Sequence, residues 1–251
     1  MTHDLKGRAC LVTGASRNIG RAIAVSLAEH GADVVVHVAR DLEAGAQTVS
    51  VVKAAGTRAT LVSGNLADPA VVKAVMDQAA AAFGRLDVVV NNAAIRPEAA
   101  FGDITYQAWR DVISTNLDSV FLVSQAALGA LRGSDQAAIV NIGGMTAHKG
   151  AAHRAHVIAA KAGVVGLTKA MAHDLAADGI TVNCVVPGLI DTERLGAAGG
   201  TDPKHRGTAT NLLGRRGLPH DVAAAILYLV GPSGRYVTGE TMHVNGGAYL
   251  S

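Results

Sequence analysis

The chain has 251 residues, of which 49% are hydrophobic and only 3% aromatic, and its formal net charge at pH 7 is +2. This length suits a single α/β domain, and the hydrophobic fraction is large enough for a substantial core. Because charges of both signs are interspersed, nothing indicates a surface for nucleic acid or for an anionic membrane. No apolar run reaches transmembrane length, and residues 1–12 lack the apolar stretch of a signal peptide. We therefore expect a cytoplasmic protein, with Cys10 and Cys184 as buried thiols in a reducing compartment.

The predicted elements alternate between short β-branched runs and Ala-rich helical segments. The candidate strands are residues 8–13, 33–38, 58–63, 86–91, 137–142, 180–186 and 241–244. Between them lie segments with helical periodicity, such as residues 19–31, where Gly31 suits a helix end. Strands separated by helices favour a parallel sheet with helices on both faces. We predict one α/β domain over residues 1–251, a doubly wound Rossmann fold of about seven parallel strands, with a loop or lid around residues 191–217.

A glycine-containing turn, "LVTGASRNIGRAIA" at residues 11–24, follows the first strand and opens the first helix. Free N–H groups at such a helix start can hold a pyrophosphate. The turn resembles the TGxxxGxG signature of the short-chain dehydrogenase/reductase family, with Asn18 in place of the middle glycine. Asn adopts left-handed backbone more readily than most residues, so we expect the turn to be preserved.

The resemblance continues in order along nearly the whole chain. "NNAA" at residues 91–94 is similar to the family's NNAG, and Asn116 matches its helix-four Asn. "NCVVPGLIDT" at 183–192 and "VTGETMHVNGG" at 237–247 match its nicotinamide-end and C-terminal segments. Within the family, the chain is similar to 3-oxoacyl-ACP-reductase-like members. The resemblance implies a dinucleotide site formed by Gly14, Ser16, Arg17, Asn18, Ile19, Gly20, Arg40, Asn65, Leu66, Asn92, Ala93, Lys161, Pro187, Gly188, Ile190 and Thr192.

The choice of cofactor follows from charge. Relatives that prefer NAD carry an acidic residue at the end of strand two, where this chain has Val38. Arg17 and Arg40 are placed to meet a 2′-phosphate. These features favour NADP(H) over NAD(H).

The family's catalytic Tyr and Ser have no hydroxyl counterparts here. In the family, a Tyr lies four residues before the Lys, one helical turn away, and a Ser lies thirteen residues before the Tyr. Lys161 matches the Lys, so Val157 occupies the Tyr position and Gly144 the Ser position. Of the four catalytic residues that the resemblance implies, this chain keeps the Lys, as Lys161, and the Asn, as Asn116.

Other polar side chains near Lys161 are candidates to replace the missing acid. If the helix begins near residue 153, Arg154 lies on the face of Lys161, where it can bind a carboxylate or stabilise an oxyanion. His148 and His153 lie on the loop expected to approach the substrate, and imidazole titrates near neutral pH. We expect His156 to point elsewhere. The three histidines match no zinc spacing, so we predict no metal site.

Three functions are consistent with these observations. The first is an NADP(H)-dependent oxidoreductase that transfers hydride between nicotinamide and a small carbonyl or alcohol substrate, with a non-standard proton donor. The second is an NADP-binding sensor or supporting subunit. The third is a lyase-type enzyme that uses Arg154 and the histidines. The resemblance also implies a homotetramer that pairs through the helix carrying Lys161; it gives no role to nucleic acid or membrane.

Overall fold

The strands form a single parallel sheet in the computed structural model, which describes residues 5–192 and 211–250. Its order is β3-β2-β1-β4-β5-β6-β7. The strands are β1 (Ala9–Val12), β2 (Asp33–Val38), β3 (Ala59–Ser63), β4 (Val88–Asn91), β5 (Ala138–Ile142), β6 (Thr181–Pro187) and β7 (Thr241–Val244). Each lies within two residues of its predicted bounds, so the predicted fold class is confirmed. The chain reverses direction across the sheet between β1 and β4, which is where doubly wound sheets bind ligands.

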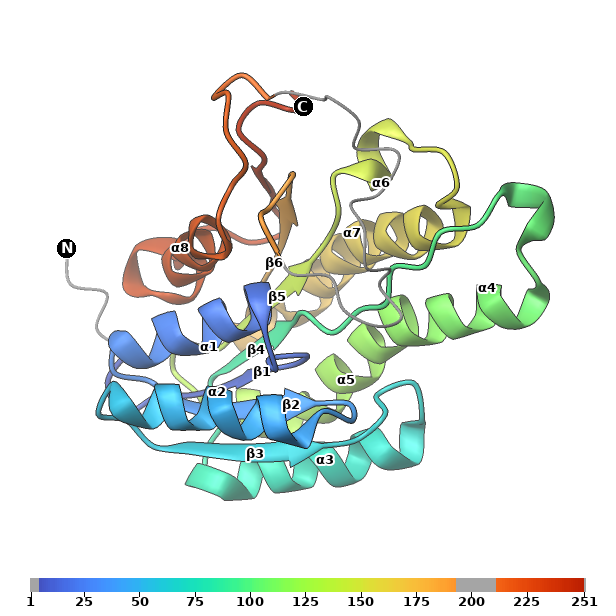
Figure 1. The fold of residues 1–251 in the computed structure, drawn as a ribbon. Coiled ribbons are helices and arrows are strands. Elements are labelled where there is room, and N and C mark those ends of the chain that lie inside the picture. The colour runs from blue at the N-terminus through green and yellow to red at the C-terminus, as the bar shows by residue number, and fades with distance from the viewer. Residues whose placement is uncertain (1–4, 193–210, 251) are drawn as a thin grey trace.

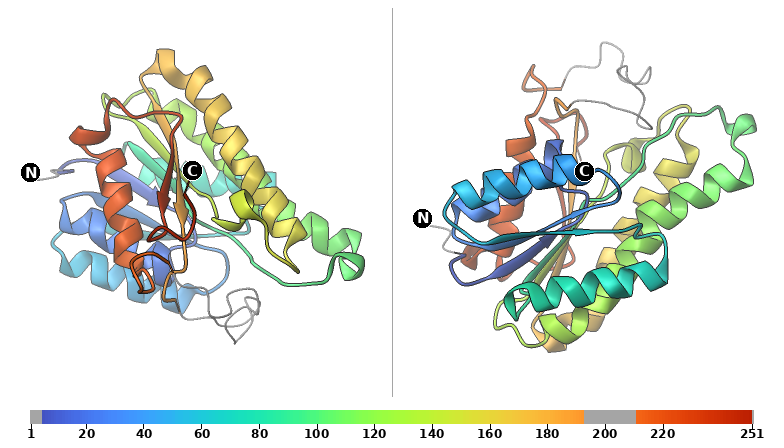
Figure 2. Two further views of the ribbon diagram at one scale, coloured as in Figure 1. Left: turned by 90° about the horizontal axis from the view of Figure 1, so that it is seen from above. Right: turned by 60° about the horizontal axis from the view of Figure 1, so that its bottom comes forward.

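Helices cover both faces of this sheet (Figure 1). One face carries α1 (Asn18–Glu29), α2 (Leu42–Ala54) and α8 (Pro219–Val230). The other carries α3 (Pro69–Phe83), α5 (Ser119–Leu131) and α7 (Ala155–Leu175). Figure 2 shows these two layers on either side of the strands. Shorter elements are the 3₁₀ turns η1 (Phe101–Asp103), η3 (Ala176–Asp178) and η6 (Pro232–Gly234), the helices α4 (Tyr106–Ile113) and α6 (Thr146–Lys149), and the π-helical turn η2 (Ser114–Asp118).

The core explains why the strands read as continuous apolar runs. Alternate residues of β1 face opposite layers: Cys10 and Val12 pack with α1 and α8, whereas Leu11 packs with α3 and α5. Burial on both faces therefore selects an apolar residue at every position of the inner strands. Cys10 and Cys184 are both buried free thiols, as predicted.

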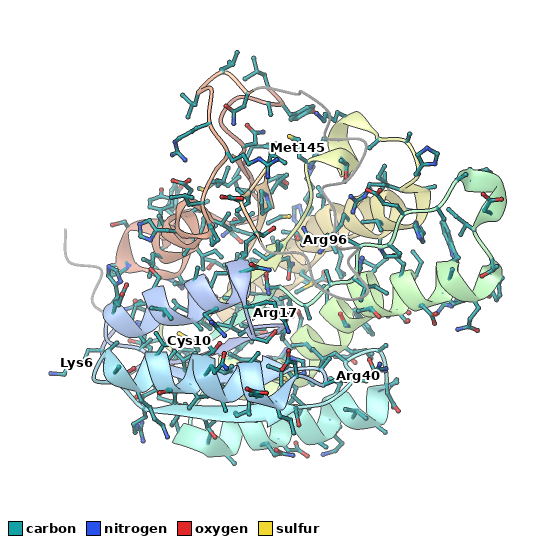
Figure 3. All side chains as sticks on the ribbon, in the orientation of Figure 1. Lys6, Cys10, Arg17, Arg40, Arg96 and Met145 are labelled. Atoms are coloured by element: carbon teal, nitrogen blue, oxygen red, sulfur yellow. The ribbon has the colours of Figure 1, made fainter. Side chains whose placement is uncertain are left out.

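The loops that follow the carboxyl ends of the strands lie together along one edge of the sheet. Figure 3 shows Arg17, Arg40 and Arg96 along this edge, while Lys6 lies at the other end of the molecule. Most of the lid predicted at residues 191–217 lies outside the described residues. At the described end of that segment, Gly217 forms an isolated β-bridge with Ile190, the residue just before the segment. No helix of the described chain is long and apolar enough to span a membrane.

Candidate active site

A cleft of about 1410 Å³ lies at this carboxyl edge, and segments from β1, β2, β4, β5, β6 and α7 line it. The predicted cofactor residues line the cleft, except Leu66, which is packed in the core beside α3. The basic side chains in the lining are Arg17, Arg40, Arg96, Lys149, Arg154, Lys161, Arg215 and Arg216, and the acidic ones are Asp41 and Asp111. The described part of the cleft is therefore suited to an anionic ligand.

The turn between β1 and α1 forms the floor of one end of the cleft. Gly14 has a positive φ of 63°, and a Cβ there would lie 2.8 Å from the Cα of Ala93. Asn18 adopts left-handed backbone with φ of 51°, so the expectation that Asn preserves this turn is confirmed. The helix α1 begins at Asn18, and no side chain caps its N-terminus. The N-terminus of such a helix is suited to a phosphate, which accepts from backbone N–H groups there.

Asn92 fastens this turn to β4. Its side-chain amide donates to the carbonyl oxygens of Thr13, at 2.9 Å, and Gly14, at 3.0 Å. In return, the Thr13 hydroxyl oxygen accepts from the backbone N–H groups of Asn92 and Ala93. These bonds join the two strands at the point where the sheet order reverses.

His37 makes a second link that holds the turn after β1, and it was not among the predicted site residues. Gly14 donates its backbone N–H to Nδ1 of His37 at 3.3 Å, so Nε2 carries the proton and donates to the Gly64 carbonyl at 3.0 Å. The side chain is 1% exposed, and burial lowers its pKa to about 4. The imidazole is therefore neutral and links the turn to the end of β3. In the sequence, His37 could have been noticed as a polar residue near the carboxyl end of the otherwise apolar strand β2.

At the outer end of the cleft, Arg17 forms an ion pair with Asp41. Asp41 also accepts from the backbone N–H of Ala44 at 3.1 Å and so caps α2. Val38 is buried, and Arg40 is exposed and lines the cleft. The sequence analysis correctly noted no acid at Val38 but missed the carboxylate three residues later. In the sequence, Asp41 could have been noticed as an Asp directly before a helix, the usual position of an N-cap.

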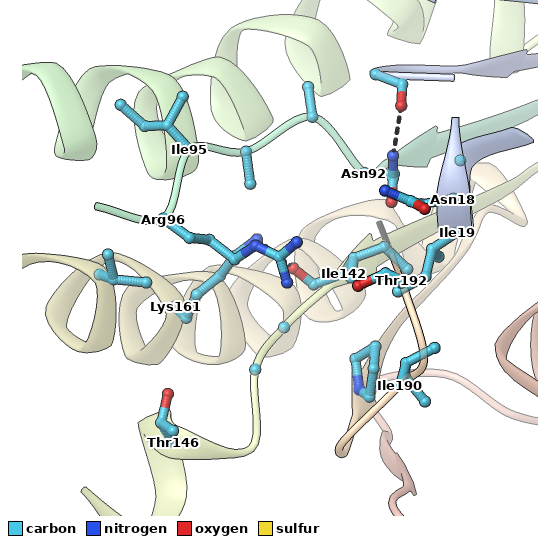
Figure 4. A pocket seen from close by; sticks show the side chains of 18 of the residues that line it. Asn18, Ile19, Asn92, Ile95, Arg96, Ile142, Thr146, Lys161, Ile190 and Thr192 are labelled. Atoms are coloured by element: carbon cyan, nitrogen blue, oxygen red, sulfur yellow. Dashed lines mark hydrogen bonds between the residues drawn. The ribbon is translucent and has the colours of Figure 1, made fainter. Parts of the chain in front are cut away.

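Lys161 lies at the other end of the cleft. Its ammonium donates to the carbonyl oxygen of Ile142 at 2.6 Å, and the residue is 6% exposed. Burial lowers the pKa of Lys161 to about 8; the nearby Cys184 opposes this, and the positive charge of Arg96 adds to it. Figure 4 shows Lys161 and Arg96 extending from opposite walls towards the same part of the cleft.

Near Lys161, the two positions where the resemblance places hydroxyl groups carry Val157 and Gly144, neither of which has a hydroxyl. Val157 lies one helical turn before Lys161 and lines the cleft. A Cβ at Gly144 would lie 3.6 Å from Cγ of Lys161, which is ordinary contact. A Ser side chain therefore fits at position 144 without displacing Lys161.

Asn116 does not line the cleft. It lies in the π-helical turn, fully buried, and its side chain makes two hydrogen bonds of 2.8 Å with the backbone of Ile95. Its amide therefore fixes the segment that carries Arg96. The predicted relay of a proton through Asn116 stays a prediction.

Arg154 lines the cleft. The helix α7 begins at Ala155, within two residues of the expected start, and Arg154 is its N-cap. The Arg154 side chain is buried and forms an ion pair with Glu98 at 3.3 Å. Its position still allows contact with a ligand.

The predicted catalytic histidines lie outside the residues that line the cleft. His148 packs against His243, with ring centroids 4.6 Å apart, and against Tyr249. His153 is exposed at a φ of 62°, and His156 is buried elsewhere, as expected. The geometry favours Lys161 and Arg154 over these histidines. In the described ranges, no three His, Cys, Asp or Glu side chains are grouped to hold a metal ion.

A parallel sheet with a glycine turn at its reversal point defines a dinucleotide-binding α/β protein. A family model described as enoyl-(acyl carrier protein) reductase matches residues 14–249. The 3-oxoacyl-[acyl-carrier-protein] reductase FabG of Vibrio cholerae is 40% identical over 248 residues, covering 98% of this chain and 99% of that protein. The chain belongs to the short-chain dehydrogenase/reductase family, a family of oxidoreductases.

Two solved structures are similar in fold. A short-chain dehydrogenase from Burkholderia cenocepacia in complex with NADP has a TM-score of 0.90 and 36% identity, covering 97% of this chain and 98% of that one. A blue fluorescent protein from a metagenomic library in complex with NADPH has a TM-score of 0.91 and 35% identity, covering 98% and 100%.

Proposed function

We propose that the protein is an NADP(H)-dependent oxidoreductase that transfers hydride between nicotinamide and a carbonyl or alcohol substrate, with Lys161 as the proton donor. One observation carries the proposal: a buried lysine ammonium lies in the same cleft as a glycine turn built for a dinucleotide. Neither position 144 nor position 157 offers a hydroxyl group to take that role.

The residues of the cleft fit the cofactor. Gly14 allows the turn to pack closely against Ala93, and the start of α1 that follows is suited to a phosphate group. Arg17 and Arg40 supply positive charge for a 2′-phosphate. The NADP and NADPH complexes of the two similar structures support this choice.

The cofactor, when bound, supplies or accepts the hydride. Lys161 supplies the proton that the carbonyl oxygen needs, because a pKa of about 8 leaves the ammonium protonated yet able to release its proton near neutral pH. Its hydrogen bond to Ile142 fixes the direction of the ammonium. Val157 presents an apolar wall beside it and limits competing water.

The test compares Lys161→Met with Lys169→Met, an exposed lysine two turns further along α7. NADPH oxidation is followed with a panel of ketones, and NADPH affinity by fluorescence titration. We expect Lys161→Met to lower kcat/KM by about 10²–10⁴-fold, the usual contribution of a general acid, with the control unchanged. Tight NADPH binding without turnover in the wild-type protein would instead favour a sensor or supporting subunit.

We also propose a homotetramer, in line with the family resemblance. Phe121 on α5 and Leu250 near the C-terminus expose large apolar surfaces, 46% and 75% respectively, that a second copy would cover. Light scattering of the purified protein decides this: a mass of about four chains supports the proposal, and a monomer contradicts it.

A further inference from the structure

Two arginines, Arg96 and Arg154, line the cleft that also holds Lys161. Arg96 follows β4, and Arg154 precedes α7; both line the cleft together with Val157. Figure 4 shows the Arg96 guanidinium directed towards Ile142 and Lys161. Three cationic groups, Arg96, Arg154 and Lys161, therefore line the cleft in which the proposed function puts the substrate.

The fold holds Arg96 in this place. The backbone of its neighbour Ile95 is fixed by both polar atoms of the Asn116 amide. The positive charge of Arg96 contributes to the lowered pKa of Lys161, so the two cationic groups lie near one another. An anionic ligand between them would be attracted by both cations.

Arg154 adds a second guanidinium group to the lining of the cleft. Only 5% of the residue is exposed, and its ion pair with Glu98 fixes the guanidinium from one side. An arginine fork matches a planar carboxylate in two parallel hydrogen bonds. The nearby Glu98 carboxylate favours a ligand with a single negative charge over a dianionic phosphate.

We propose that the substrate is a small oxo acid whose carboxylate is held by Arg96 and Arg154 while its carbonyl lies beside Lys161. This inference rests on the proposed function. In the reduction, a hydride adds to the carbonyl carbon and a proton to its oxygen, so the oxo acid becomes a hydroxy acid, NADPH becomes NADP⁺, and the carboxylate is unchanged. The Cα atoms of Arg154 and Lys161 are seven residues apart, about 10 Å along a helix axis. A small substrate, with carboxylate and carbonyl only a few bonds apart, therefore suits this spacing.

The experiment compares 2-oxobutanoate, 3-oxobutanoate and 4-oxopentanoate with their methyl esters as substrates for NADPH oxidation. We expect the wild-type protein to prefer at least one acid over its ester by more than about tenfold in kcat/KM. Arg96→Gln and Arg154→Gln should each lower kcat/KM for that acid by about 30- to 100-fold, mainly through KM, and change the ester little. The control Arg110→Gln, on the exposed side of α4, should change neither.

Esters reduced as well as acids would overturn the inference and leave the proposed function standing. Equal losses for acid and ester in the two variants would also overturn it, because they indicate a structural role. If nothing is reduced, calorimetric titration with butanoate, butanamide and propylphosphonate tests the anion site alone. Butanoate binding that is lost in Arg96→Gln supports the site; absence of binding, or tighter binding of the phosphonate, contradicts it.

Discussion

Asn116 and Ile95 exchange two hydrogen bonds of 2.8 Å, one from the Asn116 amide to the Ile95 carbonyl and one from the Ile95 N–H to the Asn116 amide oxygen. A buried residue of the π-helical turn thereby holds the loop that carries Arg96 into the cleft. Asn116 acts on the site through this loop and is a positioning residue.

Asn116→Leu should weaken both the site and the fold. The two backbone groups of Ile95 lose their partners, which should lower the free energy of unfolding by about 2 kcal/mol. The displaced Arg96 should raise KM for the substrate about tenfold, with a smaller effect on kcat. Urea unfolding and steady-state kinetics measure both quantities. Gln107→Leu, which removes an exposed amide on α4, is the control and should change neither.

His37→Phe should weaken NADPH binding, because the Gly14 N–H and the Gly64 carbonyl lose the imidazole that joins them. We expect the Kd for NADPH to rise about tenfold, a cost of about 1.4 kcal/mol, in a fluorescence titration. An unchanged Kd would show that the turn holds its shape without this link.

His37 should also make stability depend on pH. Its pKa falls from 6.5 when unfolded to about 4 when folded, so the unfolded chain binds more protons between these values. The contribution is fully present above pH 6.5, and up to about 3 kcal/mol of it is lost as the pH falls to 4. His37→Gln should lose less stability over this range than the wild-type protein, measured by urea unfolding. The same difference in the exposed control His220→Gln would contradict the assignment.

Asp41→Asn should raise the affinity for NADPH. The carboxylate pairs with Arg17, and its removal leaves more positive charge for a 2′-phosphate, whereas Asn still caps α2. Because the pair is partly exposed, the expected gain in Kd is only about three- to tenfold. Affinity for NADH, which lacks this phosphate, should change less, and an equal change for both cofactors would refute this role.

Gly144→Ser combined with Val157→Tyr should speed the reduction of a simple neutral ketone. The Ser side chain has room beside Lys161, and a Tyr hydroxyl would supply a second acid one turn away. We expect kcat to rise at least about tenfold, measured by NADPH oxidation. Gly144→Ala with the same change at position 157 is the control for packing, and thermal unfolding reports whether the larger side chain is accepted.

The sheet was predictable because its inner strands, such as β1, β4 and β5, are buried along their whole length and therefore read as apolar runs. The glycine turn was predictable because the backbone approaches other backbone closely at Gly14 and Gly20. Only glycine fits such positions, so the spacing of the glycines is visible in the local sequence. Even the replacement of a glycine by Asn18 was interpretable, since few residues adopt left-handed backbone.

The less predictable features depend on contacts between distant residues. Nothing local to His37 shows that its imidazole meets Gly14 and Gly64, which are 23 and 27 residues away. His148 was a candidate acid by its position on the chain, but packing against His243 from β7 holds it outside the cleft lining. The loop that carries Arg96 is held by the bonds of Asn116 to Ile95, which is 21 residues away along the chain.

Transfer of deuterium from NADPH labelled at both C4 positions tests the central claim most directly. With an oxo acid as acceptor, the wild-type protein should place one deuterium on the new alcohol carbon, as mass spectrometry of the product shows. Lys161→Met should do so far more slowly while still binding NADPH. Unlabelled alcohol, or no product from any carbonyl despite bound NADPH, would contradict hydride transfer in this cleft.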